Sequence, residues 1–183
     1  MPEVETSRLR LRMFEPGDLD TLCLILGDPR VVRYIGIEAG KRFTRAECED
    51  TLNRAIAAWT KYGFGRWAMI DKSTGELIGL CGFRSREGTP ELLYILAENA
   101  WKKGLATEAA AGCLRFAFEE LEVSHIIAFT RSENVVSRRV LEKLGMSYEG
   151  EVQEAGVDGV MYTIAREQFT PDESAFYRCD SSS

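Results

Sequence analysis

The stretch that most narrows the possible folds of this 183-residue chain lies between residues 91 and 130. It reads as an apolar run (ELLYILA, 91–97), a glycine-containing turn (WKKGLAT, 101–107), an amphipathic helical pattern and a second apolar run (HIIAFT, 125–130). A helical connection of this length is what two parallel neighbouring strands require. We therefore expect the two apolar runs to be parallel strands of one sheet, with the helix packed on that sheet.

The helix of this unit has an apolar side and a distinctive beginning. Its apolar residues recur at helical spacing, and they are Ala106, Ala110, Cys113, Leu114, Ala117 and Leu121. Its first turn follows Gly104, where unpaired backbone N–H groups and the positive end of the helix dipole would meet. This combination is suited to holding phosphate groups. The alternative is that Gly104 only turns the chain.

The N-terminal part of the chain predicts a strand and two helices. Apolar and basic residues alternate in RLRLRMF (8–14), which indicates a strand with one buried face. A short helix begins near Asp18. Thr44 and Glu47 have the spacing of a capping box, and the helix behind them ends near Gly63, a residue type common just after helix ends.

Further pairs of strands surround the crossover unit. RWAMI and ELIGLCGF, joined by the turn DKSTG, predict a hairpin over residues 66–83. The segments 147–152 and 160–165 predict a closing pair. This order of elements indicates the α+β class (mixed α/β), with a central, mostly antiparallel mixed sheet flanked by helices.

Two predictions concern burial after the crossover helix. HIIAFT is apolar along its length, so we expect a strand that is buried on both faces. The segment 134–145 predicts a helix that buries Val136, Val140 and Leu144 and ends at Gly145.

The composition argues against several classes of function. The net charge of −6 and the pI near 5.0 disfavour non-specific binding to nucleic acid. No apolar run approaches the roughly 20 residues of a membrane span. His125 is a single histidine and the five cysteines form no C-x-x-C pair, so we expect no metal site. Because no signal-peptide pattern is present, the expected location is the cytoplasm.

Four stretches of the sequence, in order, resemble one known family. They are TSRLRLRMFEPGDLD with DPRVVRYIG, then GELIGLCGF, ELLYILAENAWKKGLATEA and NVVSRRVLEKLGMSYEG, and together they extend nearly continuously over residues 7–169. The chain resembles the GNAT family of acetyl-CoA-dependent N-acetyltransferases, in the Rim-type branch related to ribosomal-protein alanine acetyltransferases. The resemblance implies a GNAT-like sheet and one acetyltransferase domain over residues 1–170. We expect the C-terminal tail, 171–183, to be partly disordered.

The resemblance implies where acetyl-CoA binds. The family's diphosphate turn, Gln/Arg-x-x-Gly-x-Gly/Ala, corresponds to WKKGLA, so Trp101 departs from the general pattern, although aromatic residues are common there in the Rim branch. Gly104 and Ala106 would leave room for the diphosphate, and backbone amides of the turn would point at it. Backbone N–H groups near Leu96 would stabilise the oxyanion. The implied cofactor-binding residues are Leu96, Lys102, Lys103, Gly104, Leu105, Ala106, Thr107, Asn134 and Ser137.

The catalytic candidates are Glu91 and Ser137. Some family members place a general-base glutamate where Glu91 begins its strand, and the attacking amine must lose a proton; the alternative is an exposed glutamate at a strand end. The resemblance places Ser137 near the cofactor's sulfur, where it could protonate the leaving thiolate. It places Asn134 on the pantetheine arm, although Asn134 is also a good helix N-cap. Many GNAT enzymes use a tyrosine as general acid at the position where this chain has Leu141. Glu108 is the next candidate base, but the helix dipole is enough to explain a glutamate in the first turn of a helix.

The expected reaction is direct attack of a primary amine on acetyl-CoA. A peptide α-amine, with a pKa of about 7.7–8.0 against about 10.4 for lysine, is the easier acceptor near pH 7, and the Rim-type resemblance favours it too. The alternatives are a small cationic amine, such as a polyamine or an aminoglycoside, and a CoA-binding protein of this fold without turnover. We expect no nucleic-acid, membrane or metal partner, and a monomer or homodimer. Aromatic residues that either line an acceptor groove or belong to the core are Tyr34, Trp59, Phe64, Trp67 and Tyr94.

Overall fold

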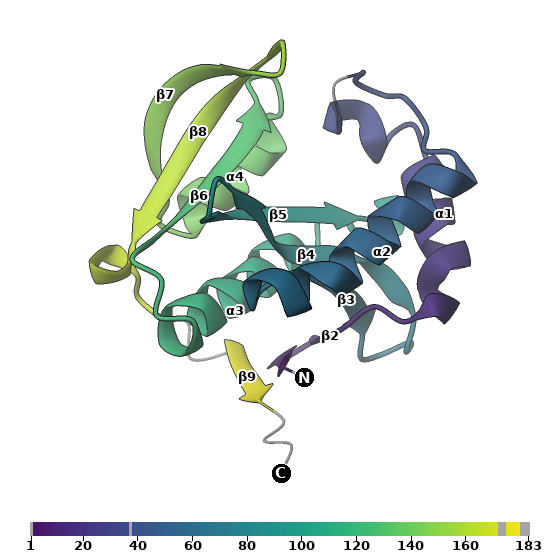
Figure 1. Cartoon of the computed structure of the whole chain (residues 1–183), viewed down its shortest axis with the longest axis horizontal. Coiled ribbons are helices and arrows are strands. Elements are labelled where there is room, and N and C mark those ends of the chain that lie inside the picture. The colour runs from purple at the N-terminus through teal and green to yellow at the C-terminus, as the bar shows by residue number, and fades with distance from the viewer. Residues whose placement is uncertain (1, 37, 172–174, 180–183) are drawn as a thin grey trace.

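A nine-stranded mixed sheet forms the centre of the computed structural model, which describes residues 2–36, 38–171 and 175–179 (Figure 1). The strand order is β7-β8-β6-β5-β4-β3-β2-β1-β9. The strands are β1 (Pro2–Thr6), β2 (Leu9–Arg12), β3 (Arg66–Asp71), β4 (Leu77–Arg86), β5 (Thr89–Leu96), β6 (His125–Arg131), β7 (Ser147–Glu154), β8 (Val157–Ala165) and β9 (Ala175–Cys179).

Helices cover both faces of this sheet. They are α1 (Leu19–Gly27), α2 (Arg45–Tyr62), α3 (Leu105–Glu120) and α4 (Val135–Lys143), with 3-10 turns at Pro16–Asp18, Val32–Tyr34, Glu98–Ala100 and Arg166–Gln168. One buried cluster joins α3 and α4 to sheet residues such as Leu92. A second cluster joins α1 and α2 to Ala68 and Leu80 on the opposite face. The layout is the predicted α+β class, a mostly antiparallel mixed sheet between helices.

The local predictions for the hairpins and for α2 are confirmed. β3 and β4 form the expected hairpin, in which Trp67 lies opposite Cys81, and β7 pairs with β8 in antiparallel fashion. The Thr44 side chain accepts a hydrogen bond from the Glu47 amide as part of a capping box, and Gly63 ends α2 at a φ of 74°. Short-range chemistry sets these features, so the sequence was sufficient to predict them.

The predicted parallel pair is β5 and β6. Glu91, near the start of β5, is paired with Ile127 in the middle of β6. The strands on either side, β4 beside β5 and β8 beside β6, are antiparallel to their neighbours. Figure 1 shows β6, β8 and β7 running at a steep angle to β5. The two parts of the sheet therefore diverge from this one point of pairing.

The expectation that β6 is buried on both faces is wrong. Ile126 and Ala128 are buried, but His125 is exposed, and Ile127 and Phe129 are only partly buried. The cluster beneath α1 and α2 extends as far as β5 and contains no residue of β6 within the described chain. The second face of β6 thus lies beyond the layer of helices that would bury it.

The predicted inward face of α4 is displaced by one position. Val136 is 74% exposed, whereas Leu141 is 1% exposed and belongs to the core. The positions directed inward are Ser137, Leu141 and Leu144, which share a helical spacing. A serine occupies the first of these positions and interrupts the apolar pattern, and this is why the valines misled the prediction.

The N-terminal and C-terminal strands were not predicted. β1 pairs with β2 on one side and with β9 on the other, both antiparallel. β9 lies within the segment that the sequence assigned to a tail, while positions 172–174 and 180–183 of that segment lie outside the described residues. The domain limit at residue 170 stays a prediction.

Candidate active site

The turn between β5 and α3 presents backbone amides at a helix start. Lys102 and Gly104 both adopt positive φ angles, of 61° and 76°. The amide of Glu108 makes the first hydrogen bond of α3, to the Gly104 carbonyl at 3.1 Å. Amides from Leu105 to Thr107 precede this bond, so the helix itself offers them no acceptor. The positive end of the helix dipole lies at the same place, and together these features suit an anion.

Trp101 fixes this turn to the end of β5. Its indole Nε1–H donates a hydrogen bond to the Leu96 carbonyl at 2.9 Å, and its ring remains 38% exposed. The Leu105 side chain is buried, whereas Lys102 and Lys103 extend into solvent. Trp101 therefore shapes the turn, while the lysines contribute positive charge at its surface.

Glu108 joins the first turn of α3 to the turn between β1 and β2. Its carboxylate accepts four hydrogen bonds, from Thr6 Oγ1, Ser7 Oγ, and the amide and Nε of Arg8. Arg8 also donates to the Lys103 carbonyl at 2.8 Å. Burial by itself would raise the pKa of Glu108, but the hydrogen bonds from Thr6 and Arg8 outweigh burial and lower it. Glu108 is thus a structural anchor beside the turn.

Glu91 is buried at the beginning of β5. It is 2% exposed, so the alternative of an exposed strand-end glutamate is wrong. Its Oε1 lies 2.7 Å from Arg84 Nη2 on the neighbouring strand, and its Oε2 has no hydrogen-bond partner among the described residues. Arg84 also lies 3.6 Å from Glu154 on β7. A buried carboxylate with one free oxygen is chemically available to a proton donor.

Alternation along β5 places its polar side chains on opposite faces of the sheet. Leu93 and Ile95 pack in the cluster under α1 and α2, and Glu91 shares their face. Leu92 and Tyr94 pack in the cluster under α3 and α4. The two faces of this strand therefore carry a carboxylate on one side and a phenol on the other.

Ser137 lies in the first turn of α4 and meets Tyr94. The Tyr94 hydroxyl is 2.9 Å from Ser137 Oγ and donates to the Ser137 carbonyl at 3.1 Å. The Ser137 amide donates to Asn134 Oδ1 at 3.3 Å, so Asn134 is a true N-cap. Leu141, one turn further along, is buried in the core. Hydroxyl groups are thus held together where β5 faces the start of α4.

Comparison with known proteins identifies the family to which this chain belongs. The sequence profile of the acetyltransferase (GNAT) domain matches residues 8–147. The chain belongs to the GNAT family. It is 33% identical to the uncharacterized N-acetyltransferase p20 of Bacillus licheniformis over 153 residues, which cover 82% of this chain and 85% of that protein. It is therefore an N-acetyltransferase, of a family whose cosubstrate is acetyl-CoA.

Solved GNAT structures share the fold. A GNAT acetyltransferase from Bacillus anthracis superposes with a TM-score of 0.78 at 28% identity, covering 90% of this chain and 99% of that one. The ribosomal-protein-S5-alanine acetyltransferase of Vibrio fischeri gives 0.75 at 18% identity, with 92% and 99% covered. The second likeness concerns the fold alone.

The GNAT cofactor residues expected from the sequence gather in two places. The turn from Leu96 to Thr107 forms one group, and Asn134 with Ser137 at the start of α4 forms the other. Glu91 shares β5 with the first group but faces away from α3. Tyr94 was missed as a partner of Ser137, because the two residues are 43 positions apart in the chain.

For three of the five aromatic residues, the alternative that they belong to the core is confirmed. Trp59, Phe64 and Trp67 are buried in the core, where the two tryptophan rings lie 4.6 Å apart. Tyr34 is partly buried in the segment between α1 and α2. That segment contacts the end of β6, because Arg131 donates to the Gly36 carbonyl at 2.8 Å.

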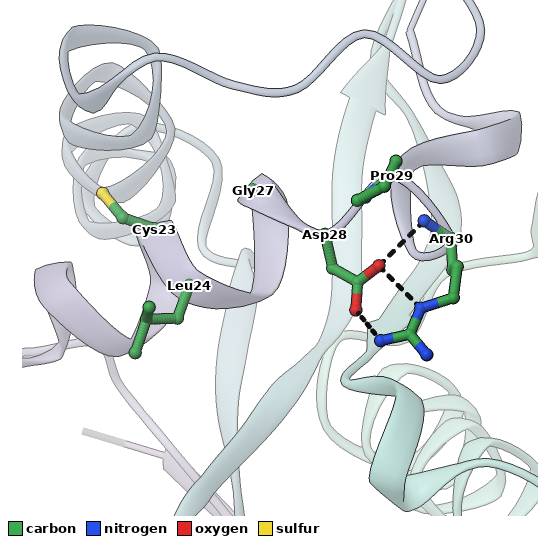
Figure 2. Close-up of a pocket in the computed structure, with 6 residues that line it drawn as sticks. All are labelled: Cys23, Leu24, Gly27, Asp28, Pro29 and Arg30. Carbon is green, nitrogen blue, oxygen red and sulfur yellow. Dashed lines mark hydrogen bonds and ion pairs between the residues drawn. The ribbon is translucent and has the colours of Figure 1, made fainter.

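Two surface clefts are lined by described residues, and the first borders the turn between β5 and α3. This cleft, of about 490 Å³, is lined by Arg8, Lys72 and Lys103 among others. The other, of about 440 Å³, lies at the end of α1 (Figure 2), where Arg30 binds the Asp28 carboxylate. Hydrogen bonds from Arg30 lower the pKa of Asp28 to about 2. Arg30 also pairs with Glu98 at 2.8 Å and so connects the end of α1 to the start of the turn.

Residues 2–36, 38–171 and 175–179 contain no group of three or more side chains suited to binding a metal ion. Over the same part of the chain, no helix combines the length and the apolar character that crossing a membrane requires.

Proposed function

We propose that this enzyme acetylates the N-terminal α-amine of a protein or peptide, as the Rim-type branch does. The observation that carries the proposal is that the candidate base and the candidate acid lie on opposite sides of β5. Glu91 lies on the face of α1 and α2, and Ser137 approaches the strand from the side of α4 through Tyr94. An acceptor amine would enter beside Glu91, while the thiol end of the cofactor would lie beside Ser137.

The turn that follows β5 would hold the cofactor. Amides between Lys102 and Thr107 would bind the diphosphate, and Lys103 would add charge at its edge. Asn134 would contact the pantetheine arm, because its side chain already lies at the start of α4. A backbone N–H near Leu96 would stabilise the oxyanion. The positive φ angles and the free amides of the turn support this assignment.

The reaction would proceed by direct attack. The amine nitrogen attacks the acetyl carbonyl carbon and forms the new C–N bond, while the proton of the amine passes to Glu91, directly or through water. The C–S bond then breaks, and the sulfur takes its proton from Ser137. The products are the acetylated amine and the free thiol of CoA, with no covalent enzyme intermediate.

Proton chemistry favours an α-amine over a lysine as the acceptor, because a smaller share of an α-amine has to lose a proton before it can attack. About a tenth of a peptide α-amine is neutral near pH 7, against well under a thousandth of a lysine side chain.

A panel of acceptors tests the proposal by release of CoA thiol. We expect turnover with lysine-free peptides that carry free N-termini, and little with the same peptides acetylated at the N-terminus and extended by a lysine. Preference for a polyamine or an aminoglycoside would favour a small-amine enzyme. Binding of acetyl-CoA without turnover of any acceptor in the panel would instead favour a protein that only binds the cofactor.

A further inference from the structure

Every polar group of Ser137 is engaged by a neighbouring side chain. The amide donates to Asn134 Oδ1, and both the carbonyl and Oγ lie within hydrogen-bond distance of the Tyr94 hydroxyl. Tyr94 therefore contacts Ser137 at two atoms, from a different element. A hydroxyl that must present its proton in one direction needs such contacts, since a free serine rotates among three staggered positions.

Tyr94 is a partly buried polar group to which the proposed reaction assigns no role. It extends from β5 to the start of α4, where the two parts of the sheet diverge. The position on α4 where many family members carry a tyrosine holds Leu141, which is buried in the core. A phenol therefore reaches this region from the strand.

We propose that Tyr94 is a positioning residue that orients the Ser137 hydroxyl toward the leaving sulfur. The inference rests on the role given to Ser137 in the proposed function. The phenol O–H can form a hydrogen bond either to the Ser137 carbonyl or to Ser137 Oγ. When the hydrogen bond is to Oγ, the hydroxyl proton of Ser137 is free to point at the sulfur, and the Ser137 hydroxyl becomes a stronger hydrogen-bond donor.

Tyr94 acts without giving up its proton. Burial raises the pKa of Tyr94, and the hydrogen bond to Ser137 lowers it by less. The other titratable side chains facing the phenol are Cys81 on β4 and Tyr162 on β8. Tyr94 thus stays a neutral donor. As the C–S bond breaks, its electron pair goes to the sulfur, the Ser137 proton moves to it, and Oγ regains a proton from solvent.

Binding of CoA and desulfo-CoA tests the inference without any acceptor. The two ligands differ only in the thiol, so the ratio of their affinities measures how much the interactions of the sulfur contribute to binding. In the wild-type protein, a hydrogen bond to the thiolate should make CoA affinity rise with pH, relative to desulfo-CoA, by about tenfold between pH 7 and 10. We expect this rise to disappear in both Ser137→Ala and Tyr94→Phe, and to remain in the control Tyr62→Phe, since Tyr62 is an exposed residue at the end of α2.

The outcomes separate the two assignments. Loss of the rise in Ser137→Ala but not in Tyr94→Phe would overturn the role of Tyr94 and leave that of Ser137. An unchanged rise in Ser137→Ala, or no rise in the wild type, would overturn both. A severalfold loss of desulfo-CoA affinity in Tyr94→Phe would mean that the phenol only builds the site, and would overturn the inference.

Kinetics with an acceptor provide a second readout. Tyr94→Phe should lower kcat about tenfold with little change in KM for acetyl-CoA. The same change in the Ser137→Ala background should have no further effect, because there is no hydroxyl left to orient. Equal losses in both backgrounds would contradict the inference, since a purely structural role does not depend on Ser137.

Discussion

Gly104 is the residue on which the proposed diphosphate site most depends. Its φ of 76° suits glycine, and a Cβ at this position would lie 3.7 Å from Arg8 Nη2, so a side chain has room but a strained backbone. Gly104→Glu should weaken acetyl-CoA binding by a further tenfold to hundredfold, in order of magnitude, relative to Gly104→Gln. The glutamine has the same size and strain without the charge. Equal affinities of the two variants in calorimetry would contradict the diphosphate assignment.

Glu91 is the proposed general base, and a substitution that removes its carboxylate tests this role. Glu91→Gln should lower kcat by about a hundredfold or more near pH 7 while acetyl-CoA affinity is preserved. The loss should shrink at high pH, because the acceptor amine then loses its proton to solvent. The pH profile of kcat measures this, and an unchanged rate at pH 7 would remove Glu91 as the base.

The ion pair of Glu91 requires its own control. Arg84→Gln removes the partner of Glu91 and leaves the carboxylate in place. If Glu91 is the base, this variant should not reproduce the fall in kcat, because the carboxylate that accepts the proton is still present. A fall equal to that of Glu91→Gln would assign the effect to the broken pair.

Among the elements, α3 depends on an anchor from the far end of the chain. Glu108 accepts hydrogen bonds from Thr6, Ser7 and Arg8, about 100 positions earlier. Glu108→Gln should lower the free energy of unfolding by about 1–3 kcal/mol at pH 7, measured by urea denaturation. Ser7→Ala, which removes only the exposed hydroxyl bond, should cost far less.

The stability that Glu108 provides should depend on pH in a defined direction. The pKa of Glu108 is lowered in the folded protein from a value of 4.5. Its contribution is therefore fully present above about pH 4.5 and is lost as the pH falls through the lower folded pKa. The difference in stability between wild type and Glu108→Gln should narrow over that range. A constant difference down to pH 2 would contradict this account.

At the scale of the whole molecule, the two parts of the sheet meet between β5 and β6, where Glu91 is paired with Ile127. A ligand that bridges β5, α3 and α4 should therefore stabilise the entire molecule. Acetyl-CoA and desulfo-CoA at about 100 times their Kd should each add roughly 2.7 kcal/mol, and so raise Tm by about 5–10 °C, whereas NAD should not. No shift with either CoA compound in folded protein would mean that the turn after β5 binds no cofactor.

Local chemistry was enough to predict the elements whose signals lie within a few residues. The Thr44 capping box, the hairpin around DKSTG and the glycine turn at Gly104 were read correctly, because each depends on neighbours in sequence. The crossover from β5 to β6 followed from two apolar runs and the length of the helix between them. The α+β class followed from that order of elements.

Tertiary contacts decided the features that make the site. In the sequence, Trp101 is a departure from the general pattern of the GNAT diphosphate turn. In the structure, its indole N–H donates a hydrogen bond to the Leu96 carbonyl and joins the turn to the end of β5. The inward face of α4 includes Ser137 because Tyr94, 43 positions away, meets it there. Glu91 is buried beside its ion-pair partner Arg84, which comes from the neighbouring strand β4. Hydrogen bonds and burial between distant residues leave no periodic signal in the chain, so only the folded structure reveals them.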